Sequence, residues 1–175
     1  FIFILYSYFS ILFYSHNLFH NSVLLIVGLL SFFIFYLKNN YKKYEFYTLL
    51  SVFFILFISY LLFKSHDDFP YYHFPYTYYL TQNSFFVGIG NFNHGFRTPS
   101  SIFYLNSLFY LPMVKFYLFQ IGPVSIMGFV IITFLTKIFQ SLKAKKIDYL
   151  YYLNLTFILF IIVFFYRLAE HGTDR

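Results

Sequence analysis

Most side chains in this sequence that could do chemistry lie in one polar stretch, residues 64–101. It contains two acids, three histidines and an arginine: Asp67, Asp68, His66, His73, His94 and Arg97. The sequence on either side consists almost entirely of Phe, Leu, Ile, Val and Tyr. Because ionisable groups beside apolar segments are costly to keep, we expect this stretch to hold the functional site.

The adjacent acids Asp67 and Asp68 are the candidates for catalysis. A carboxylate can accept a proton from a hydroxyl nucleophile or provide oxygen ligands to a divalent cation. The alternative is that both acids are solvated at a helix end and take no part in chemistry. His66 and His73 flank the pair. They are candidates for binding phosphate or, alternatively, for packing at the membrane interface, and their spacing matches no zinc motif. A divalent cation on the two carboxylates is the one cofactor that the sequence suggests.

A second candidate is the segment 88–97, whose sequence is GIGNFNHGFR. Glycine permits tight backbone turns, so Asn93, His94 and Arg97 could converge on an anion, and a planar guanidinium suits a phosphate. The alternative is a turn without a ligand. The segment lacks the third glycine of the dinucleotide-binding motif and follows no strand, which excludes a Rossmann fold.

A third polar group follows the last apolar segment. Glu170, His171 and Asp174 lie there, between Arg167 and Arg175. Charges beside lipid tend to pair or to line water, so we expect these residues to join the loop residues around one phosphate-binding cavity. The alternative is a charged helix cap.

The composition of the chain is typical of a membrane protein. Of its 175 residues, 60% are hydrophobic and 10% charged, whereas a soluble domain is about 25% charged. The net charge of +6 comes largely from lysines in two short loops, which indicates membrane topology and not nucleic-acid binding. There is no cysteine, which excludes disulfides and thiolate metal sites. Since Phe1 lies inside an apolar run, we expect residues 1–175 to be one transmembrane domain from a longer protein.

Apolar runs predict about five transmembrane helices, because open strands cannot satisfy their backbone in lipid. The expected spans are roughly 1–14, 18–37, 46–63, 117–137 and 149–166, the first being shorter than the 20 or so residues that a span needs. Lysine-rich loops face the cytoplasm, which places loops 38–45 and 137–148 inside and the long loop 64–116 outside. All six histidines then lie on the exterior side.

The exterior loop is expected to carry two short helices. The Tyr-rich run 70–80 suits a helix at the membrane interface, and Pro70 is tolerated in a first helical turn. Glycine, asparagine and serine predict irregular structure over 81–101. Residues 102–111 are expected to form a short apolar helix that Pro112 ends.

This arrangement resembles the GT-C class of membrane glycosyltransferases, which have an acidic pair at the outer end of a span and an aromatic stretch in a long exterior loop. More narrowly, three parts of the sequence are similar to an uncharacterised group of bacterial multi-span proteins with that architecture. These parts are residues 68–73, Gly90 and Asn91 with Arg97, and residues 170–175.

The resemblance implies a function and a location. It implies transfer of a sugar from a polyprenyl-phosphate donor to an acceptor on the exterior face of the bacterial inner membrane. It places the catalytic acid on Asp67 or Asp68. The implied partners are membrane lipid and the polyprenyl-phosphate-sugar donor.

Two other functions remain open from the sequence. A transporter or flippase would need ionisable groups near the middle of the membrane, and the expected spans contain none there. A non-catalytic scaffold subunit would place no demand on the acids of the loop.

Overall fold

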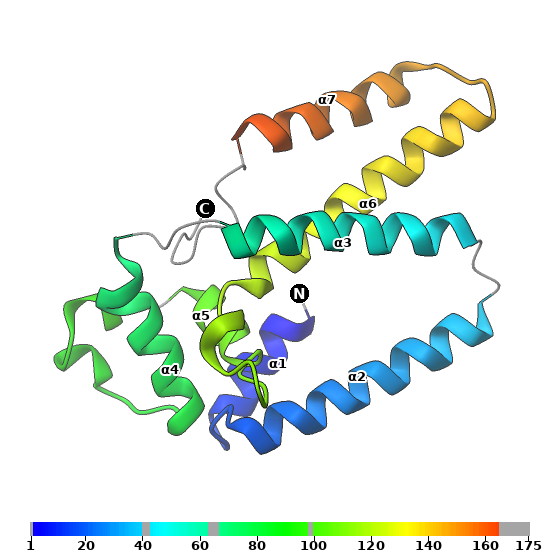
Figure 1. Ribbon diagram of the computed structural model, residues 1–175. Helices are drawn as coiled ribbons and strands as arrows, with labels where there is room; N and C mark the ends of the chain where they lie inside the picture. Colours follow the sequence, from blue (N-terminus) through cyan, green and yellow to red (C-terminus); the bar gives the residue numbers. More distant parts are fainter. Residues whose placement is uncertain (1, 40–42, 63–66, 98–99, 165–175) are drawn as a thin grey trace. The chain divides into compact units, whose positions relative to one another are not determined.

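The computed structural model describes residues 2–39, 43–62, 67–97 and 100–164, and the regular elements in these ranges are helices. The expectation of an all-α fold is therefore confirmed for the described residues. The α-helices are α1 (Ile2–Ile11), α2 (Leu18–Lys38), α3 (Lys43–Leu62), α4 (Phe74–Gln82), α5 (Ser101–Ser107), α6 (Ile121–Lys143) and α7 (Tyr149–Phe164) (Figure 1). A π-helical turn η1 (Phe69–His73) and the 3-10 turns η2 (Ile89–Asn91), η3 (His94–Phe96) and η4 (Phe116–Leu118) lie between α3 and α6.

Two of the described helices, α2 and α6, are long and apolar enough to cross a membrane. They have 21 and 23 residues, whereas α1 has 10 and α7 has 16, fewer than the 20 or so that a span needs. Helix α3 has 20 residues but is not among the helices that qualify by length and composition together. The expectation of five spans is therefore wrong for the described residues. Length and composition do not by themselves distinguish a span from a signal sequence near an N-terminus or from a core helix of a soluble protein. For this reason we call α2 and α6 candidate spans.

The chain forms two compact units. The first contains the described residues within 1–40 and 64–122, which include α1, α2, α4 and α5. The second contains the described residues within 41–63 and 123–169, which include α3, α7 and most of α6. The described candidate residues of the polar loop belong to the first unit.

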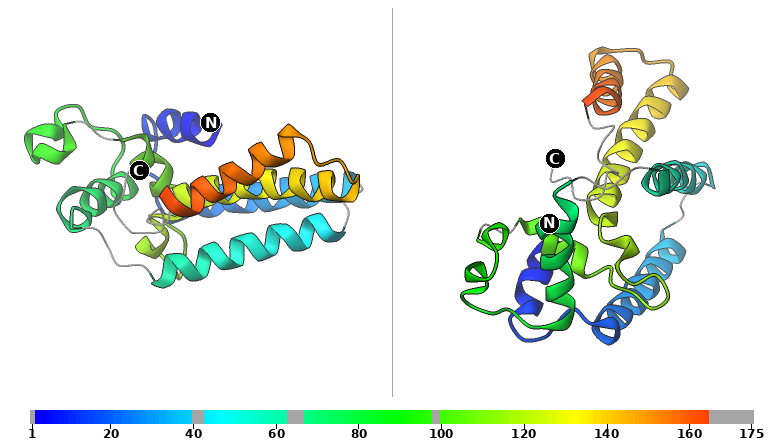
Figure 2. Two further views of the ribbon diagram at one scale, coloured as in Figure 1. Left: turned by 90° about the horizontal axis from the view of Figure 1, so that it is seen from above. Right: turned by 60° about the vertical axis from the view of Figure 1, so that its left-hand side comes forward.

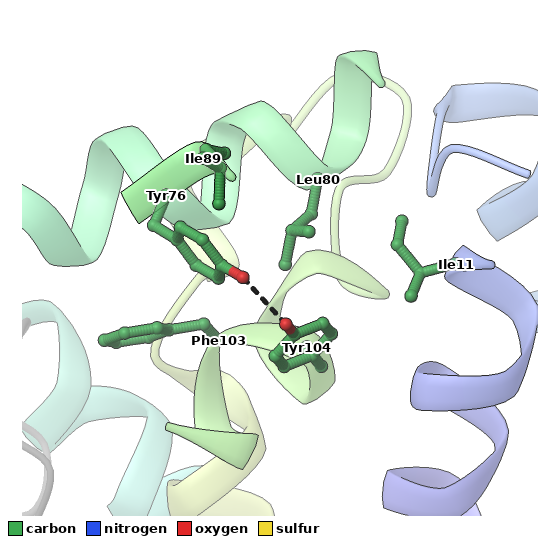
Figure 3. Close-up of a cluster of buried hydrophobic side chains, with 6 residues drawn as sticks. All are labelled: Ile11, Tyr76, Leu80, Ile89, Phe103 and Tyr104. Atoms are coloured by element: carbon green, nitrogen blue, oxygen red, sulfur yellow. Dashed lines mark hydrogen bonds between the residues drawn. The ribbon is translucent and has the colours of Figure 1, made fainter. Parts of the chain in front are cut away.

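The core of the first unit forms where α5 packs against α4 and α1. Six buried side chains make it: Ile11, Tyr76, Leu80, Ile89, Phe103 and Tyr104 (Figure 3). The hydroxyls of Tyr76 and Tyr104 share a hydrogen bond of 2.7 Å, which satisfies two polar groups that burial removes from water. Burial raises the pKa of Tyr76, so this tyrosine stays neutral and keeps the bond.

The Tyr-rich stretch is helical, as expected, because η1 continues directly into α4. Pro70 lies in the first turn of η1, where the missing N–H costs no intrahelical bond, and Pro75 lies at the junction where the π-helical turn η1 passes into α4. Tyr76 and Leu80 lie one turn apart and point into the core, which gives α4 a buried face. A position at the membrane interface stays a prediction.

Helix α5 ends earlier than expected, at Ser107 and not at Leu111. Beyond Ser107 the backbone tightens, because the N–H groups of Phe109 and Tyr110 donate three residues back, to the carbonyls of Asn106 and Ser107. The side-chain amide of Asn21 also donates to the carbonyls of Ser107 and Tyr110, at 2.8 and 3.1 Å. A residue far away in the sequence therefore helps to hold this end of the helix. The expected irregular structure over 81–101 is confirmed for the described residues of this range, apart from the last turn of α4, the short turns η2 and η3, and Ser101, which begins α5.

The second unit is held together by aromatic contacts. Phe53 of α3 meets Phe129 of α6 edge to face, with ring centroids 5.2 Å apart. Helix α7 runs back beside α6 (Figure 2), and Phe134 and Phe157 stack between them at 5.2 Å.

The loop that joins α6 to α7 combines its lysines with one acid. Lys146 forms an ion pair with Asp148 at 3.7 Å. Asp148 also accepts a hydrogen bond from the N–H of Tyr151 at 3.2 Å, which caps α7. Asp148 therefore moderates the lysine charge, and its role is structural.

We expect Gly122→Ala to lower the free energy of unfolding by about 1–3 kcal/mol. Gly122 lies in the first turn of α6, and a Cβ there would lie 2.7 Å from Asn106 Oδ1 and 2.9 Å from Leu105 Cδ2. Asn106 and Leu105 are buried, so neither can move aside cheaply. Gly28→Ala is the matched control, because a Cβ there meets no atom within 4 Å and alanine favours a helix. Thermal unfolding measures both, and an unchanged midpoint for Gly122→Ala would contradict the close packing.

Candidate functional site

The acid pair lies in the turn before η1, and its two members differ. Asp67 is exposed, whereas Asp68 is half-buried. The hydroxyl of Tyr72 donates to Asp68 Oδ2 across a long 3.5 Å, and the Asp68 carbonyl accepts from the N–H groups of Tyr71 and Tyr72. Asp68 is thus the oriented carboxylate of the pair, and Asp67 is the more accessible to solvent.

The second candidate segment folds back onto the helix that follows the acid pair. Asn93 Nδ2 donates to the Tyr71 carbonyl at 3.2 Å, and Asn93 Oδ1 accepts from the N–H of Gly95 at 2.9 Å. Gly95 lies so close to Tyr72 that a Cβ would stand 2.5 Å from the Tyr72 Cβ. The packing of η3 on η1 therefore requires glycine at this position, and it brings two separate parts of the loop together.

His94 and Arg97 are the exposed candidates of this segment for binding an anion. Arg97 Nε donates to the Gly90 carbonyl at 3.4 Å, which holds the base of the side chain. A hollow of about 410 Å³ lies beside it, lined by residues 85–91 with Tyr76, Phe96 and Arg97. Gly88 has φ +94°, a left-handed conformation that favours glycine, so the turn that lines the hollow depends on it. Asn93 is occupied in holding η3 to η1, which leaves His94 and Arg97 to meet an anion.

His73 lies apart from these exposed groups. It is 5% exposed, and its ring lies 4.3 Å from that of Tyr72 and 4.9 Å from that of Phe103. This position fits packing in the core better than the predicted contact with phosphate.

Four candidates lie outside the described residues: His66, Glu170, His171 and Asp174. The expected meeting of the loop with the C-terminal polar group therefore stays a prediction. Within the described ranges, no three His, Asp or Glu side chains are grouped to hold a metal ion.

A second polar cluster, which sequence reasoning did not single out, surrounds His16. This side chain is fully buried, and its Nε2 and Nδ1 lie 2.8 Å from Ser10 Oγ and 2.6 Å from Ser107 Oγ. The Ser107 hydroxyl donates its own proton to the Tyr104 carbonyl, so His16 carries its proton on Nδ1. Burial, and then the neighbouring His20, lower the pKa of His16 to about 3. His16 is therefore neutral and links α5 to α1.

Asn21 extends this cluster along α2 to His20. Its Nδ2 lies within hydrogen-bonding distance of three carbonyls, those of His16, Ser107 and Tyr110. Its Oδ1 lies 2.9 Å from His20 Nδ1, and His20 Nε2 lies 2.9 Å from the hydroxyl of Tyr6. One sequence feature could have indicated this cluster: residues 15–17 and 20–22 are polar, whereas the region around them is apolar.

Comparison with known proteins adds no residue roles. No family model, no curated protein and no solved structure matches this chain. The roles of its residues follow from the geometry of the first unit and from general chemistry.

Proposed function

We propose that this chain is part of a membrane glycosyltransferase of the GT-C kind. It would transfer a sugar from a polyprenyl-phosphate donor to an acceptor hydroxyl on the exterior face of the bacterial inner membrane. The observation that carries the proposal is the packing of η3 on η1, where Asn93 bonds to Tyr71 and Gly95 meets Tyr72. This packing supports one site in which a base and an anion-binding group act together.

The proposed reaction needs both groups. Asp68 accepts the proton of the acceptor hydroxyl, whose oxygen bonds to the anomeric carbon of the sugar. The bond from that carbon to the phosphate oxygen breaks, and the polyprenyl phosphate leaves with the electron pair. Arg97 and His94 donate hydrogen bonds to the phosphate as its negative charge grows. Asp67 positions the hydroxyl; if a divalent cation takes part, Asp67 and Asp68 would hold it through their carboxylate oxygens, and it would neutralise the same charge.

The candidate spans are consistent with an exterior site. Lys38 and Lys143 lie in the last turns of α2 and α6, and lysines at the ends of spans favour the cytoplasm. The first turns of both helices then lie on the exterior side, and the polar loop directly precedes α6 in the sequence. This orientation also agrees with the cytoplasmic positions expected for loops 38–45 and 137–148.

A transporter or flippase is the second candidate, and the candidate spans give it little support. Transport across a bilayer usually needs ionisable groups near its middle. The middle turns of α2 and α6, residues 24–34 and 126–136, contain none. If the protein transferred no sugar, a role as a non-catalytic scaffold subunit would be the better interpretation.

We expect Arg97→Ala to raise the KM for the donor by roughly tenfold or more, because a hydrogen bond to a charged group is worth about 1.5–3 kcal/mol. The assay measures sugar transfer by the full-length protein in proteoliposomes over a range of polyprenyl-phosphate-sugar concentrations. Arg97→Lys should recover part of the affinity, since it restores the charge but not the planar fork. Lys115→Ala removes another exposed cation of the first unit and is the control.

Two results would count against this assignment. If Arg97→Ala left the KM unchanged, the anion would bind elsewhere. If the unmodified full-length protein transferred no sugar from any polyprenyl-phosphate donor, the glycosyltransferase proposal itself would fail.

A further inference from the structure

A second hollow, of about 470 Å³, lies at the junction of α1 and α2, away from the acid pair in the sequence. Its volume is within the range of small-molecule sites, about 300–1,000 Å³. One part of its lining is aromatic and polar and includes Tyr6, Tyr14, Phe19 and His20. The lining contains no Asp, Glu, Lys or Arg, so a ligand would meet no fixed charge there.

The rest of the hollow runs down one face of α2. Val23, Leu24 and Val27 line it, and with His20 they have the i, i+3, i+4, i+7 spacing of a single helical stripe. Seven residues of helix extend about 10 Å, so the stripe leads from a polar end into the apolar length of a candidate span. This shape suits an amphiphile with its head group beside His20 and an alkyl chain along α2.

The hydrogen bonds of Asn21 determine which nitrogen of His20 carries the proton and, through it, the direction of the Tyr6 hydroxyl. Its amide nitrogen faces three backbone carbonyls, so its Oδ1 must face His20 and accept from Nδ1–H at 2.9 Å. A neutral imidazole with its proton on Nδ1 has a lone pair on Nε2. The Tyr6 hydroxyl, 2.9 Å from Nε2, therefore donates its proton to His20.

This direction gives the hollow an acceptor for a cationic head group. Because the proton of Tyr6 is used by His20, its oxygen offers only lone pairs to a ligand. The rings of Tyr6, Tyr14 and Phe19 are electron-rich and attract ammonium groups. Tyr14, Ser15 and Asn17 also line the hollow and carry donors, which can meet the phosphate of the same lipid, while the Tyr6 oxygen accepts the ammonium N–H.

The geometry points to a binding site for one membrane lipid with a primary ammonium head group. The ammonium donates to the Tyr6 oxygen among the three aromatic rings, and one chain lies along Val23, Leu24 and Val27. The site is independent of the acid pair and of sugar transfer, so a failure of the glycosyltransferase proposal would leave it standing.

Native mass spectrometry of the full chain in detergent tests the proposal. The probes are three lipids with identical dioleoyl chains: phosphatidylethanolamine, phosphatidylcholine and phosphatidylglycerol. We expect one retained phosphatidylethanolamine, bound roughly tenfold more tightly than phosphatidylglycerol, since a hydrogen bond to a charged group has about that effect. Tyr6→Phe keeps the ring and removes the oxygen. It should therefore lower the affinity for phosphatidylethanolamine about tenfold and leave the affinity for phosphatidylcholine unchanged.

Two further variants separate binding from folding. Val27 is 54% exposed, so Val27→Trp should block the apolar end of the site without disturbing the core, and should lower the affinity for all three lipids. Tyr117→Phe removes a hydroxyl from another exposed tyrosine, 66% exposed, and should change nothing. The site would be refuted by the absence of one-to-one lipid binding, or by affinities that neither Tyr6→Phe nor Val27→Trp alters. Phosphatidylcholine or phosphatidylglycerol binding as tightly as phosphatidylethanolamine would refute the primary ammonium.

Discussion

Asp68→Asn is expected to lower the turnover of sugar transfer by about 10²–10⁴, the usual contribution of a general base. Asparagine keeps the shape of the side chain and cannot accept the proton of the acceptor hydroxyl. Asp67→Asn should cost less, because Asp67 is exposed and it is Asp68 that the Tyr72 hydroxyl orients. The measurement is the transfer rate of the full-length protein at saturating donor.

The control for this experiment is Asp148→Asn. Asp148 pairs with Lys146 and caps α7 in the second unit, so its loss should leave turnover unchanged. If both loop variants transferred sugar at the unmodified rate, the catalytic assignment would be wrong and a scaffold would be the better reading. Equal large losses in both variants, together with loss of transfer on chelation, would indicate a divalent cation held by the two carboxylates.

Acid is expected to destabilise the first unit through His16. The pKa of this buried imidazole is lowered from 6.5 to about 3, by burial first and by His20 second. Between these two values the unfolded chain binds a proton that the folded protein does not bind, so stability falls as pH falls. The contribution of His16 is fully present above pH 6.5 and is lost at up to about 1.4 kcal/mol per pH unit below it.

Unfolding midpoints of the purified full chain between pH 8 and pH 4 measure this effect. His16→Gln should be less stable than the unmodified protein at pH 8, because it loses a hydrogen bond between buried groups, worth about 1–3 kcal/mol. Its stability should then decline less steeply with acid, since glutamine does not titrate. His94→Gln, which changes an exposed histidine, is the control. Parallel pH curves for His16→Gln and the unmodified protein would contradict the assignment.

The helical class and the helix over the Tyr-rich stretch could be predicted from the sequence. Long apolar runs indicated helices, and two of them, α2 and α6, qualify as candidate spans. The prolines and tyrosines of 70–80 indicated a helix, which is observed as η1 and α4. These features depend on neighbours within a turn or two, because helix formation and its interruption by proline and glycine are local effects.

The number of spans and the ends of the helices were predicted less well. Helix α5 stops at Ser107, where the backbone tightens into three-residue turns and the amide of Asn21, 86 residues earlier, donates to the Ser107 carbonyl. The sequence left open whether His73 binds phosphate or packs, and its burial against Phe103 could be seen only in the structure. A pattern along the chain cannot show which distant side chain will cover a residue.

The sequence by itself determined the helical segments, the scarcity of charge and the residues able to do chemistry. Only the tertiary structure decided which of these residues meet. Gly95 lets η3 pack on η1 beside the acid pair, and His16 bonds to Ser107 across 91 positions. Hydrogen bonds and close contacts of this kind form between atoms that folding brings together, so their partners depend on the packing of helices and not on spacing along the chain.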